Sequence, residues 1–418
     1  MRIVIFTIGS RGDVQPYVAL AKGLRSAGHT VTVATHAQFE DLVRAHGVDF
    51  VGIAGDVRDM LESRSGQAWL RSGYNPVKFA RQFMHILEPF KKVLLNESFN
   101  VCQHAEAIIY STLSFPVYHI AEALNVPCFY APLQPMSRTH EIPYIQLAGS
   151  FTLGRAANWW THIICEQLFW QPLRHDVNMW RVNQLDLPKE SFFGSFSKVY
   201  KRECPFLYGF SESIFPKPRD WPAWHYITGY WFLNGRDWMP DPKLVAFLES
   251  GTAPVYVGFG SMVVYDDPNA FVELILNAIK RNGQRVILQN GWNSWSTQCL
   301  PDWVFPVDYV PHDWLFPRMS AVVHHGGAGT TAAGLRAGVP TVTVPFFADQ
   351  PFWGARIAAL GAGCKPIPPK RLSAERLAQA IGAATTDEDM KTCAAALGSK
   401  LRNEKGVARA VNIINRYL

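Results

Sequence analysis

Short apolar runs alternate with amphipathic stretches along the first third of the chain. Runs rich in Val, Ile and small residues lie at residues 2–8, 30–35, 48–53, 105–111 and 126–133. Between the first three runs, residues 16–29 and 37–47 carry the apolar spacing of helices. Because strands and helices that alternate in this way form a parallel sheet covered on both faces, the pattern predicts a doubly wound α/β domain.

The same plan returns in the second half of the chain. Predicted strands lie at residues 254–262, 285–290, 304–310, 321–327 and 340–346. Helical patterns at residues 269–283 and from about Thr330 separate some of these strands, and a further helical pattern at residues 351–361 follows the last of them. We therefore predict two α/β domains of similar construction, without shorter internal repeats.

Two segments depart from this rhythm. Residues 158–185 form one long helical pattern with more aromatic residues than a single apolar stripe needs. They either pack on the domain or present an apolar surface to an acceptor or a membrane.

Prolines concentrate at residues 215–240, which favours a stiffened connection between domains. The predicted division is an N-terminal domain at 1–214, a linker at 215–240, a C-terminal domain at 241–400 and a closing helix at 401–418.

Composition fits a globular protein and narrows the class of partner. Of the 418 residues, 48% are apolar and 18% are charged, and 40 Lys and Arg stand against 34 Asp and Glu. The basic residues are scattered, which suits an anionic ligand or membrane headgroups and does not indicate nucleic acid. Nothing in the sequence indicates an obligate protein partner.

The number and spacing of the cysteines and the hydropathy of the chain indicate the cellular compartment. The seven cysteines are far apart and form no CxxC pair, so neither a disulfide framework nor a zinc site is indicated. The first apolar run is too short for a secretory signal, and no apolar stretch reaches the length of a membrane span. We expect a cytoplasmic protein that can contact a membrane peripherally.

The strongest candidate for chemistry is a glycine-rich turn between a strand and a helix, AVVHHGGAGTTAAGL. The strand ends at His324 and His325, and Thr330 lies at the start of the helix. Glycines let a phosphate approach the backbone, and a helix start offers free N–H groups and partial positive charge. The turn has neither the GK[ST] of a P-loop nor GxGxxG, so a purely structural role stays open.

A second candidate follows the next predicted strand. Asp349 and Gln350 precede a helix that begins near Pro351, so they project from the same sheet edge as the glycine-rich turn. A carboxylate beside an amide can hold adjacent hydroxyl groups of a sugar. Asp349 alone could equally be the N-cap of that helix.

A third candidate, Asp13, lies just after the first predicted strand in IVIFTIGSRGDVQP. A carboxylate at the end of a parallel strand can act as a general base, particularly where desolvation raises its pKa. The alternative is that Asp13 serves as the N-cap of the following helix.

Three blocks together resemble the UDP-glycosyltransferase superfamily, in the form found in sterol glucosyltransferases and related to glycopeptide-antibiotic and macrolide glycosyltransferases. They are IGSRGDVQPYVALAKGL, VYVGFGSM and HDWLFPRMSAVVHHGGAGTTAAGLRAGVPTVTVPFFADQPFWGAR. The resemblance implies a GT-B fold, in which two Rossmann-like, doubly wound parallel-sheet domains face each other across a cleft. It places the donor on the C-terminal domain and the acceptor on the N-terminal one, and implies that the helix at 401–418 crosses back.

The resemblance also implies roles for particular residues, with Asp13 as the general base. The residues that would contact the nucleotide sugar are Ser10, Arg11, Gly12, Ser261, Val310, His312, His325, Gly327, Ala328, Gly329, Thr330, Asp349 and Gln350. Val310 and His312 match positions that hold the nucleobase, and Asp349 and Gln350 match those that hold the sugar. Tyr309 and Ala333 replace the Trp and Glu of the plant pattern, which weakens the case for UDP over dTDP.

No metal and no cofactor are expected. The helix start, His325 and hydroxyl donors would offset the charge of the leaving diphosphate, with UDP-glucose as a co-substrate. The acidic triplet Asp387-Glu388-Asp389 is interpreted as a solvated helix face rather than a manganese site.

The sequence therefore predicts an inverting transferase that moves glucose from UDP-glucose to a hydroxyl of a sterol or a similar polycyclic lipophile. A macrolide, polyketide or glycopeptide acceptor with a UDP- or dTDP-sugar is the near alternative. An NAD-dependent oxidoreductase is disfavoured, because no GxGxxG follows the first strand and the second strand ends in His36 rather than an acid. A non-catalytic binder of sugar nucleotides or lipids is a third alternative, against which the retention of Asp13, Asp349 and Gln350 argues.

Overall fold

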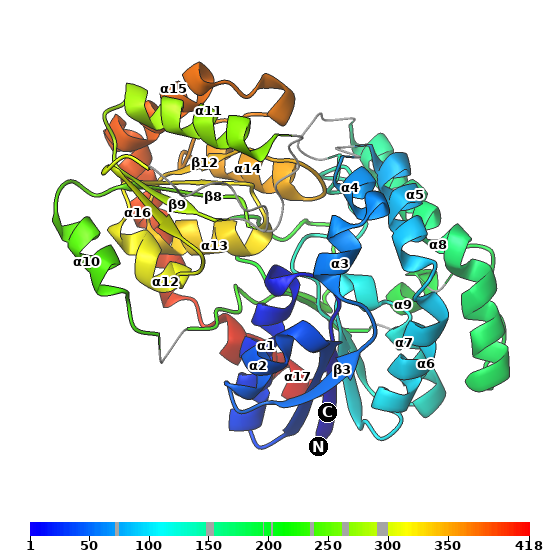
Figure 1. The fold of residues 1–418 in the computed structure, drawn as a ribbon. Helices are drawn as coiled ribbons and strands as arrows, with labels where there is room; N and C mark the ends of the chain where they lie inside the picture. Colours follow the sequence, from blue (N-terminus) through cyan, green and yellow to red (C-terminus); the bar gives the residue numbers. More distant parts are fainter. Residues whose placement is uncertain are drawn as a thin grey trace. The chain divides into compact units, whose positions relative to one another are not determined.

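The chain divides into two compact units in a computed structural model (Figure 1). The structure describes residues 1–71, 75–147, 154–194, 196–201, 204–234, 238–260, 267–290 and 300–418. Unit 1 contains Met1–Leu233 and Lys405–Leu418, and unit 2 contains Asn234–Glu404.

Unit 1 is built on a parallel sheet whose described strands take the order β3-β2-β1-β4-β5-β6-β7. The strands are β1 Arg2–Phe6, β2 Thr30–His36, β3 Asp49–Ile53, β4 Ala107–Tyr110, β5 Cys128–Tyr130, β6 Phe206–Tyr208 and β7 His225–Ile227. The chain adds β2 and β3 on one side of β1 and then β4 on the other. The carboxyl ends of β1 and β4 therefore form the switch point at which doubly wound sheets bind ligands.

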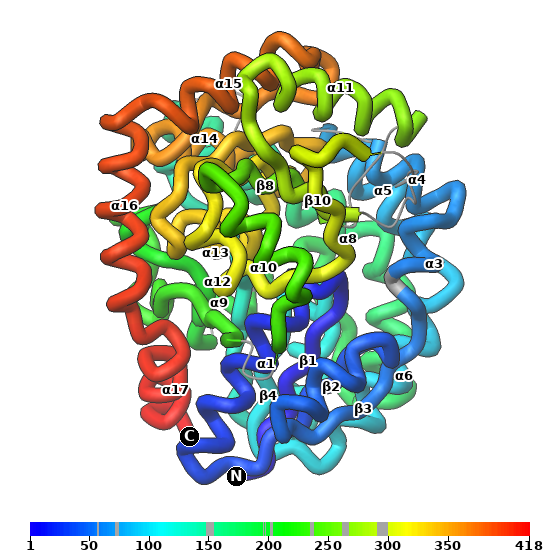
Figure 2. The backbone as a smooth tube through the Cα atoms, turned by 60° about the vertical axis from the view of Figure 1, so that its left-hand side comes forward, coloured from blue at the N-terminus to red at the C-terminus, as the bar shows by residue number. Residues whose placement is uncertain are grey.

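Helices cover both faces of this sheet. Those described in unit 1 are α1 Arg11–Ser26, α2 Glu40–Arg44, α3 Val57–Glu62, α4 Arg64–Leu70, α5 Pro76–Leu87, α6 Lys91–Cys102, α7 Val117–Leu124, α8 Arg155–Gln184, α9 Phe196–Lys201 and α17 Gly406–Tyr417. Helices α1 and α17 lie side by side on one face, and α6 and α7 lie on the other (Figures 1 and 2). Ile5 of β1, Leu20 of α1 and Ile414 of α17 belong to one buried apolar cluster on the first face.

The proline-rich stretch that was expected to link the domains packs largely within unit 1. Residues 215–233 belong to that unit and contribute the edge strand β7. Phe215 and Trp221 are buried, and the Trp221 ring stacks on Tyr208 of β6 with the centroids 4.4 Å apart. The prolines therefore shape a packed connection between two short strands, and the chain passes into unit 2 after Leu233.

The aromatic-rich segment forms the long helix α8. One side of the helix is buried in unit 1 through Trp170, Val177 and Trp180, which accounts for part of the aromatic content. Trp160 and Ile164 lie exposed on another side. None of the described helices combines the length and the hydropathy that a bilayer span requires.

Unit 2 repeats the plan with a parallel sheet whose described strands take the order β10-β9-β8-β11-β12. They are β8 Val255–Gly258, β9 Val286–Gln289, β10 Val304–Val307, β11 Ala321–His324 and β12 Thr341–Thr343. The helices described in this unit are α10 Pro242–Glu249, α11 Pro268–Arg281, α12 His312–Leu315, α13 Ala328–Ala337, α14 Gln350–Ala359, α15 Ala374–Thr386 and α16 Glu388–Asn403.

The core of unit 2 lies between its sheet and its helices. One apolar cluster contains Tyr256, Ile287 and Val322 of the strands together with residues of α12. Helices α11 and α15 lie side by side (Figure 2). The prediction of two doubly wound parallel-sheet domains is confirmed.

Unit 1 buries a histidine that has no hydrogen-bond partner among the described residues. The His225 ring of β7 stacks on Phe206 of β6, with centroids 4.2 Å apart and planes 9° from parallel, and both ring nitrogens are unpaired. Burial, reinforced by the nearby Lys217 charge, lowers the pKa of His225 from 6.5 to about 3. Folding therefore excludes a proton from this site in mildly acid solution.

We predict that His225 makes unit 1 less stable as the pH falls from 6.5 towards 3. In that window the unfolded chain binds a proton at His225 that the folded chain does not, so the free energy of unfolding falls with falling pH. In His225→Phe this contribution disappears and the pH dependence is shallower. Urea midpoints measured at several pH values check this, with the exposed His104→Phe as control. Parallel pH profiles for wild type and His225→Phe would contradict the assignment.

Candidate active site

In unit 2, the glycine-rich turn lies at the carboxyl end of the central strand β11. His324, the last residue of β11, pairs with Gly258 of β8 on one side and with Thr343 of β12 on the other. The ends of three parallel strands therefore meet where the turn begins. Helix α13 starts at Ala328 directly after the turn, and its N-cap Gly327 makes no side-chain cap. The first N–H groups of α13 thus have no capping side chain, as an anion site requires.

The turn and the Asp349–Gln350 pair are brought into direct contact. Gly326 has a φ of +89°, and a Cβ at this position would lie 2.9 Å from the backbone oxygen of Gln350. Only glycine meets both the left-handed conformation and the close approach. Two sequence candidates that are more than twenty residues apart therefore belong to one site.

The uncharged ring of His325 lies against this turn. Its ring lies against Gly327, and a Cβ on Gly260 after β8 would be 3.5 Å from its Cε1 atom. Burial lowers the pKa of His325 to about 4, so the ring is uncharged at neutral pH. Its Nδ1 atom is buried without a hydrogen-bond partner among the described residues. A bound group that pairs with this nitrogen would remove the cost of leaving it unsatisfied.

His324 holds the turn in place from within the sheet. Its Nδ1 atom accepts a hydrogen bond from the backbone N–H of Gly326 at 3.0 Å. Burial, followed by the charges of His325 and His312, keeps the pKa of His324 well below 6.5, so Nδ1 stays an acceptor. From the sequence, His324 is recognisable only as the end of a strand, because no residue pattern indicates a hydrogen bond from its ring to the N–H group two residues later.

The side chains of Asp349 and Gln350 are both oriented by their surroundings. The indole N–H of Trp353 donates to Asp349 Oδ2 at 2.7 Å, and this carboxylate makes no cap on α14. Gln350 Oε1 accepts from the backbone N–H groups of Phe346 and Phe347 at 2.7 and 3.3 Å. The amide nitrogen of Gln350 is thereby left as the donor. The contact of Trp353 with Asp349 was not predicted from the sequence. The spacing of four residues could have indicated it, because residues at i and i+4 lie on the same face of a helix.

The residues expected to hold a nucleobase lie at the end of β10. Val310 is buried, and His312 begins α12, with its ring stacked on Phe316 at 4.2 Å between centroids. The Tyr256 ring meets His312 edge-on at 5.9 Å. Tyr309, at the position of the stacking Trp in the plant pattern, is 49% exposed. Ser261 lies outside the described residues.

In unit 1, Asp13 lies in the first turn of α1 after β1. The backbone N–H and the hydroxyl of Ser10 both donate to Asp13 Oδ2, at 2.8 and 2.9 Å. Ser10, rather than Asp13, occupies the N-cap position of α1. Gly9 has a φ of +136°, and a Cβ there would lie 2.5 Å from Asp13 Oδ2, so this glycine makes room for the carboxylate. Arg11 and Gly12, in the same turn, are exposed.

The electrostatics of Asp13 suit a base. Burial raises its pKa above 3.8, and the two Ser10 hydrogen bonds counter part of that rise. Both bonds are made to Oδ2, and Oδ1 accepts no hydrogen bond from the described residues. The Oδ1 atom is therefore the oxygen that could accept a proton.

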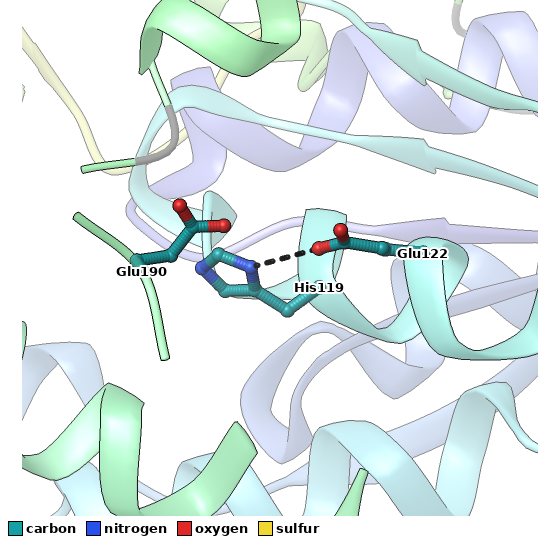
Figure 3. A group of neighbouring side chains, drawn as sticks. All are labelled: His119, Glu122 and Glu190. Carbon is teal, nitrogen blue, oxygen red and sulfur yellow. Dashed lines mark ion pairs between the residues drawn. The ribbon is translucent and has the colours of Figure 1, made fainter. Parts of the chain in front are cut away.

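A buried acidic cluster elsewhere in unit 1 has the composition of a metal site. His119, Glu122 and Glu190 lie together, with the His119 ring between the two carboxylates (Figure 3). Arg181 Nη1, however, lies 2.6 Å from both His119 Nδ1 and Glu122 Oε2 and 3.4 Å from Glu190 Oε1. The guanidinium already supplies the positive charge, so the residues do not fit a metal ion.

The acidic triplet near the end of unit 2 serves local helix structure. Asp387 Oδ1 accepts from the N–H of Met390 at the start of α16, and Glu388 pairs with Lys391 at 2.9 Å on an exposed face. These partners are ordinary for the first turn of a helix.

Comparisons with known proteins match both halves of the chain. The family model described as the glycosyltransferase family 28 N-terminal domain matches residues 3–143. The model described as the C-terminal domain of erythromycin biosynthesis protein CIII-like proteins matches residues 273–410.

Curated relatives match the whole chain. The sterol 3-beta-glucosyltransferase of Aspergillus clavatus is 40% identical over 100% of this chain and 30% of its own length. The protein of the same name from Cryptococcus neoformans is 36% identical over 100% of this chain and 27% of its own length. The chain thus spans about three tenths of the length of the curated relatives it matches.

Solved structures share the fold at low identity. The calicheamicin glycosyltransferase CalG4 matches with a TM-score of 0.70 and 17% identity, over 100% of this chain and 98% of that one. The glycosyltransferase SnogD from Streptomyces nogalater matches with a TM-score of 0.69 and 19% identity, over 100% of both chains.

We predict that Gly326→Ala destabilises unit 2 by roughly 1–3 kcal/mol, because the left-handed φ and the contact with Gln350 both oppose a Cβ. Gly329→Ala is the matched control, since a Cβ at Gly329 meets nothing within 4 Å. Alanine in the first turn of α13 should leave stability unchanged or raise it by up to about 1 kcal/mol. Urea unfolding of the three proteins measures the difference. Equal losses in the two variants would show that the contact with Gln350 is not the cause.

Proposed function

We propose that the chain is a member of the UDP-glycosyltransferase superfamily and transfers glucose from UDP-glucose to a hydroxyl of a sterol or a similar lipophile, with inversion at the anomeric carbon. The two glycosyltransferase family models, the curated relatives and the fold shared with solved glycosyltransferases support this proposal. The observation that carries the proposal is the contact between the glycine-rich turn and Gln350, which joins a phosphate-type helix start to a sugar-type pair of polar side chains. The 40% identity to a sterol 3-beta-glucosyltransferase supports the choice of sugar and acceptor.

The donor would be held by unit 2. The uncapped start of α13 and neutral His325 would donate to the diphosphate, with the hydroxyl of Thr330 and the backbone at Gly327, Ala328 and Gly329 beside them. Asp349 and the amide nitrogen of Gln350 would bind adjacent sugar hydroxyls. Val310 and His312 would contact the nucleobase. These donors stabilise charge on the departing diphosphate without a proton transfer.

Asp13 of unit 1 would act as the general base. The acceptor hydroxyl transfers its proton to Asp13 Oδ1 as its oxygen bonds to the anomeric carbon, and the bond from that carbon to the diphosphate oxygen breaks with its electron pair. A raised pKa makes Asp13 a stronger base, and the Ser10 hydrogen bonds fix its orientation. Ser10 and Arg11 lie in the same turn and would contact the donor in the assembled complex. The proposal requires the donor bound on unit 2 to reach Asp13.

Two other functions would leave different signatures. A transferase for macrolide, other polyketide or glycopeptide acceptors would use the same donor-binding residues, and it would differ in its acceptor and could take a UDP- or a dTDP-sugar. An NAD-dependent oxidoreductase would bind NAD, for which the turn after β1 lacks GxGxxG. A change in tryptophan fluorescence on adding UDP, with no change on adding NAD, distinguishes the transferase from the oxidoreductase.

We predict that Asp13→Asn lowers kcat by roughly 10² or more, because the amide cannot accept the proton. The amide oxygen can still accept both Ser10 hydrogen bonds, so UDP binding measured by calorimetry should be unchanged. Asp49→Asn is the control, since Asp49 is exposed at the amino end of β3 and forms a surface ion pair with Arg25. Unaltered turnover in Asp13→Asn would remove Asp13 from this role, and lost UDP binding would indicate a donor-binding role instead.

For the acceptor, we expect glucosylated products when the protein is incubated with UDP-glucose and a panel of 3β-hydroxysterols. Mass spectrometry of the products identifies both sugar and acceptor, and parallel reactions with dTDP-glucose test the nucleotide. Turnover of macrolides with inactivity on every sterol would reject the sterol assignment and keep the transferase. Inactivity on all acceptors, combined with UDP binding, would favour a non-catalytic binder.

A further inference from the structure

Unit 1 exposes a group of large apolar side chains that the proposed chemistry does not use. Trp160 and Ile164 of α8 are 60% and 56% exposed, and Phe192 and Phe193 in the loop after α8 are 57% and 60% exposed. Scattered single exposures are normal, but four large side chains in one segment are not. We call these four residues the aromatic surface.

The backbone contacts of the loop place these residues on one side of α8. The carbonyl of Phe193 accepts from the side-chain amide of Gln167, and the carbonyl of Phe192 accepts from the side-chain amide of Gln171. Residues 160, 164, 167 and 171 recur at helical spacing along one line of α8. The Phe192–Phe193 loop therefore covers the part of this line that directly follows Trp160 and Ile164.

The loop is fixed through its backbone, and its rings are left outside the core. The indole N–H of Trp170, which is fully buried, also donates to the Phe192 carbonyl at 2.9 Å. The Phe192 and Phe193 rings meet each other edge-on with centroids 5.5 Å apart. Packing therefore does not explain why these two positions are aromatic.

The charged side chain that contacts the aromatic surface is basic, because the Arg174 guanidinium lies 5.0 Å from the Phe192 ring centroid. Arg155 and Lys189 are exposed elsewhere in residues 154–194. The acids of the segment are mostly engaged with cations of their own: Glu166 with Arg138, Asp176 with Lys91, and Glu190 with Lys198 and Arg181. Asp186 is the exposed acid within residues 154–194. Exposed aromatic rings in a segment that also exposes Arg and Lys complement the interface of an anionic bilayer.

The size of the surface argues against a second copy of the chain as the occupant. Aromatic side chains cover roughly 150–250 Å² each when fully buried, so these partly exposed residues offer roughly 400–500 Å² in total. A stable protein interface takes about 800 Å² from each partner. A bilayer has no such minimum, because a few inserted rings together with basic residues suffice for reversible binding.

We propose that the aromatic surface inserts into the headgroup region of an anionic lipid bilayer and holds unit 1 at the membrane. Trp160, Ile164, Phe192 and Phe193 enter the boundary between headgroups and acyl chains, and Arg174 beside Phe192 pairs with a lipid phosphate. The inference does not depend on the proposed reaction, since lipid binding is measured without sugar donor or acceptor. If the proposed function holds, this docking places the enzyme where lipophilic acceptors are dissolved.

The test is sedimentation of the full chain with vesicles of phosphatidylcholine alone and of phosphatidylcholine mixed with phosphatidylserine. We expect binding to the mixed vesicles that weakens in high salt, because salt screens the attraction between Arg174 and the anionic headgroups. The double variant Phe192→Ser, Phe193→Ser should bind at least about tenfold more weakly, since it loses the inserted rings. Met239→Ser is the matched control, because Met239 is 85% exposed in unit 2 outside the aromatic surface. It should bind as the wild type does.

The folding of the double variant is checked by its circular dichroism and urea midpoint, which should equal those of wild type because both rings are exposed. If the folded double variant binds vesicles as tightly as wild type, or if wild type does not bind the mixed vesicles, the proposal is overturned. Light scattering after size-exclusion chromatography measures the oligomeric state and so tests whether a second copy of the chain covers the aromatic surface. If wild type is a dimer and the double variant is a monomer, the aromatic surface binds a second copy of the chain and the membrane proposal is rejected.

Discussion

The contact between Gly326 and the backbone of Gln350 is the constraint on which the site in unit 2 depends. Parallel pairing of β11 with β8 and β12 brings three strand ends to one edge, but it does not by itself join the loops that leave them. The absent Cβ of Gly326 lets the turn lie directly on the start of α14. The uncapped start of α13, which follows this turn, is thereby held next to the residue that follows Asp349. Within the described residues, His325 beside the turn keeps a ring nitrogen without a hydrogen-bond partner. In unit 1, Gly9 gives Asp13 room in the same manner.

The sequence predicts features that depend on periodicity or on short contiguous motifs. Alternating runs were enough for two parallel sheets, and the strand-to-helix turn at His325 was visible because glycines are conspicuous. The 215–240 stretch shows the limit, since β7 has only three residues and is too short to display a period of two. The local density of prolines therefore predicted a linker where the chain packs against Tyr208.

Supporting residues within the site escaped the sequence for a related reason. His324 and Trp353 act by orienting a neighbouring turn or carboxylate, and any polar side chain of suitable reach could do so at those positions. Gly9 differs from the chain's other glycines only through its φ and the atoms around it. These roles depend on which atoms surround the residue in the folded protein, so no sequence pattern indicates them. The placement of Asp13 and Asp349, in contrast, follows from strand ends that the hydrophobic pattern already locates.

The helix α17 has a consequence for how this molecule forms on the ribosome. Unit 1 begins at the first residue, yet the face of its sheet beneath α1 is completed by Ala410, Ile413 and Ile414, which are synthesised after all of unit 2. During translation, the nonpolar side chains of unit 1 that α17 later covers remain exposed to solvent while unit 2 is synthesised and folds. Chaperone occupancy should therefore persist on unit 1 until residues 405–418 leave the exit tunnel, even though most of its strands are made first.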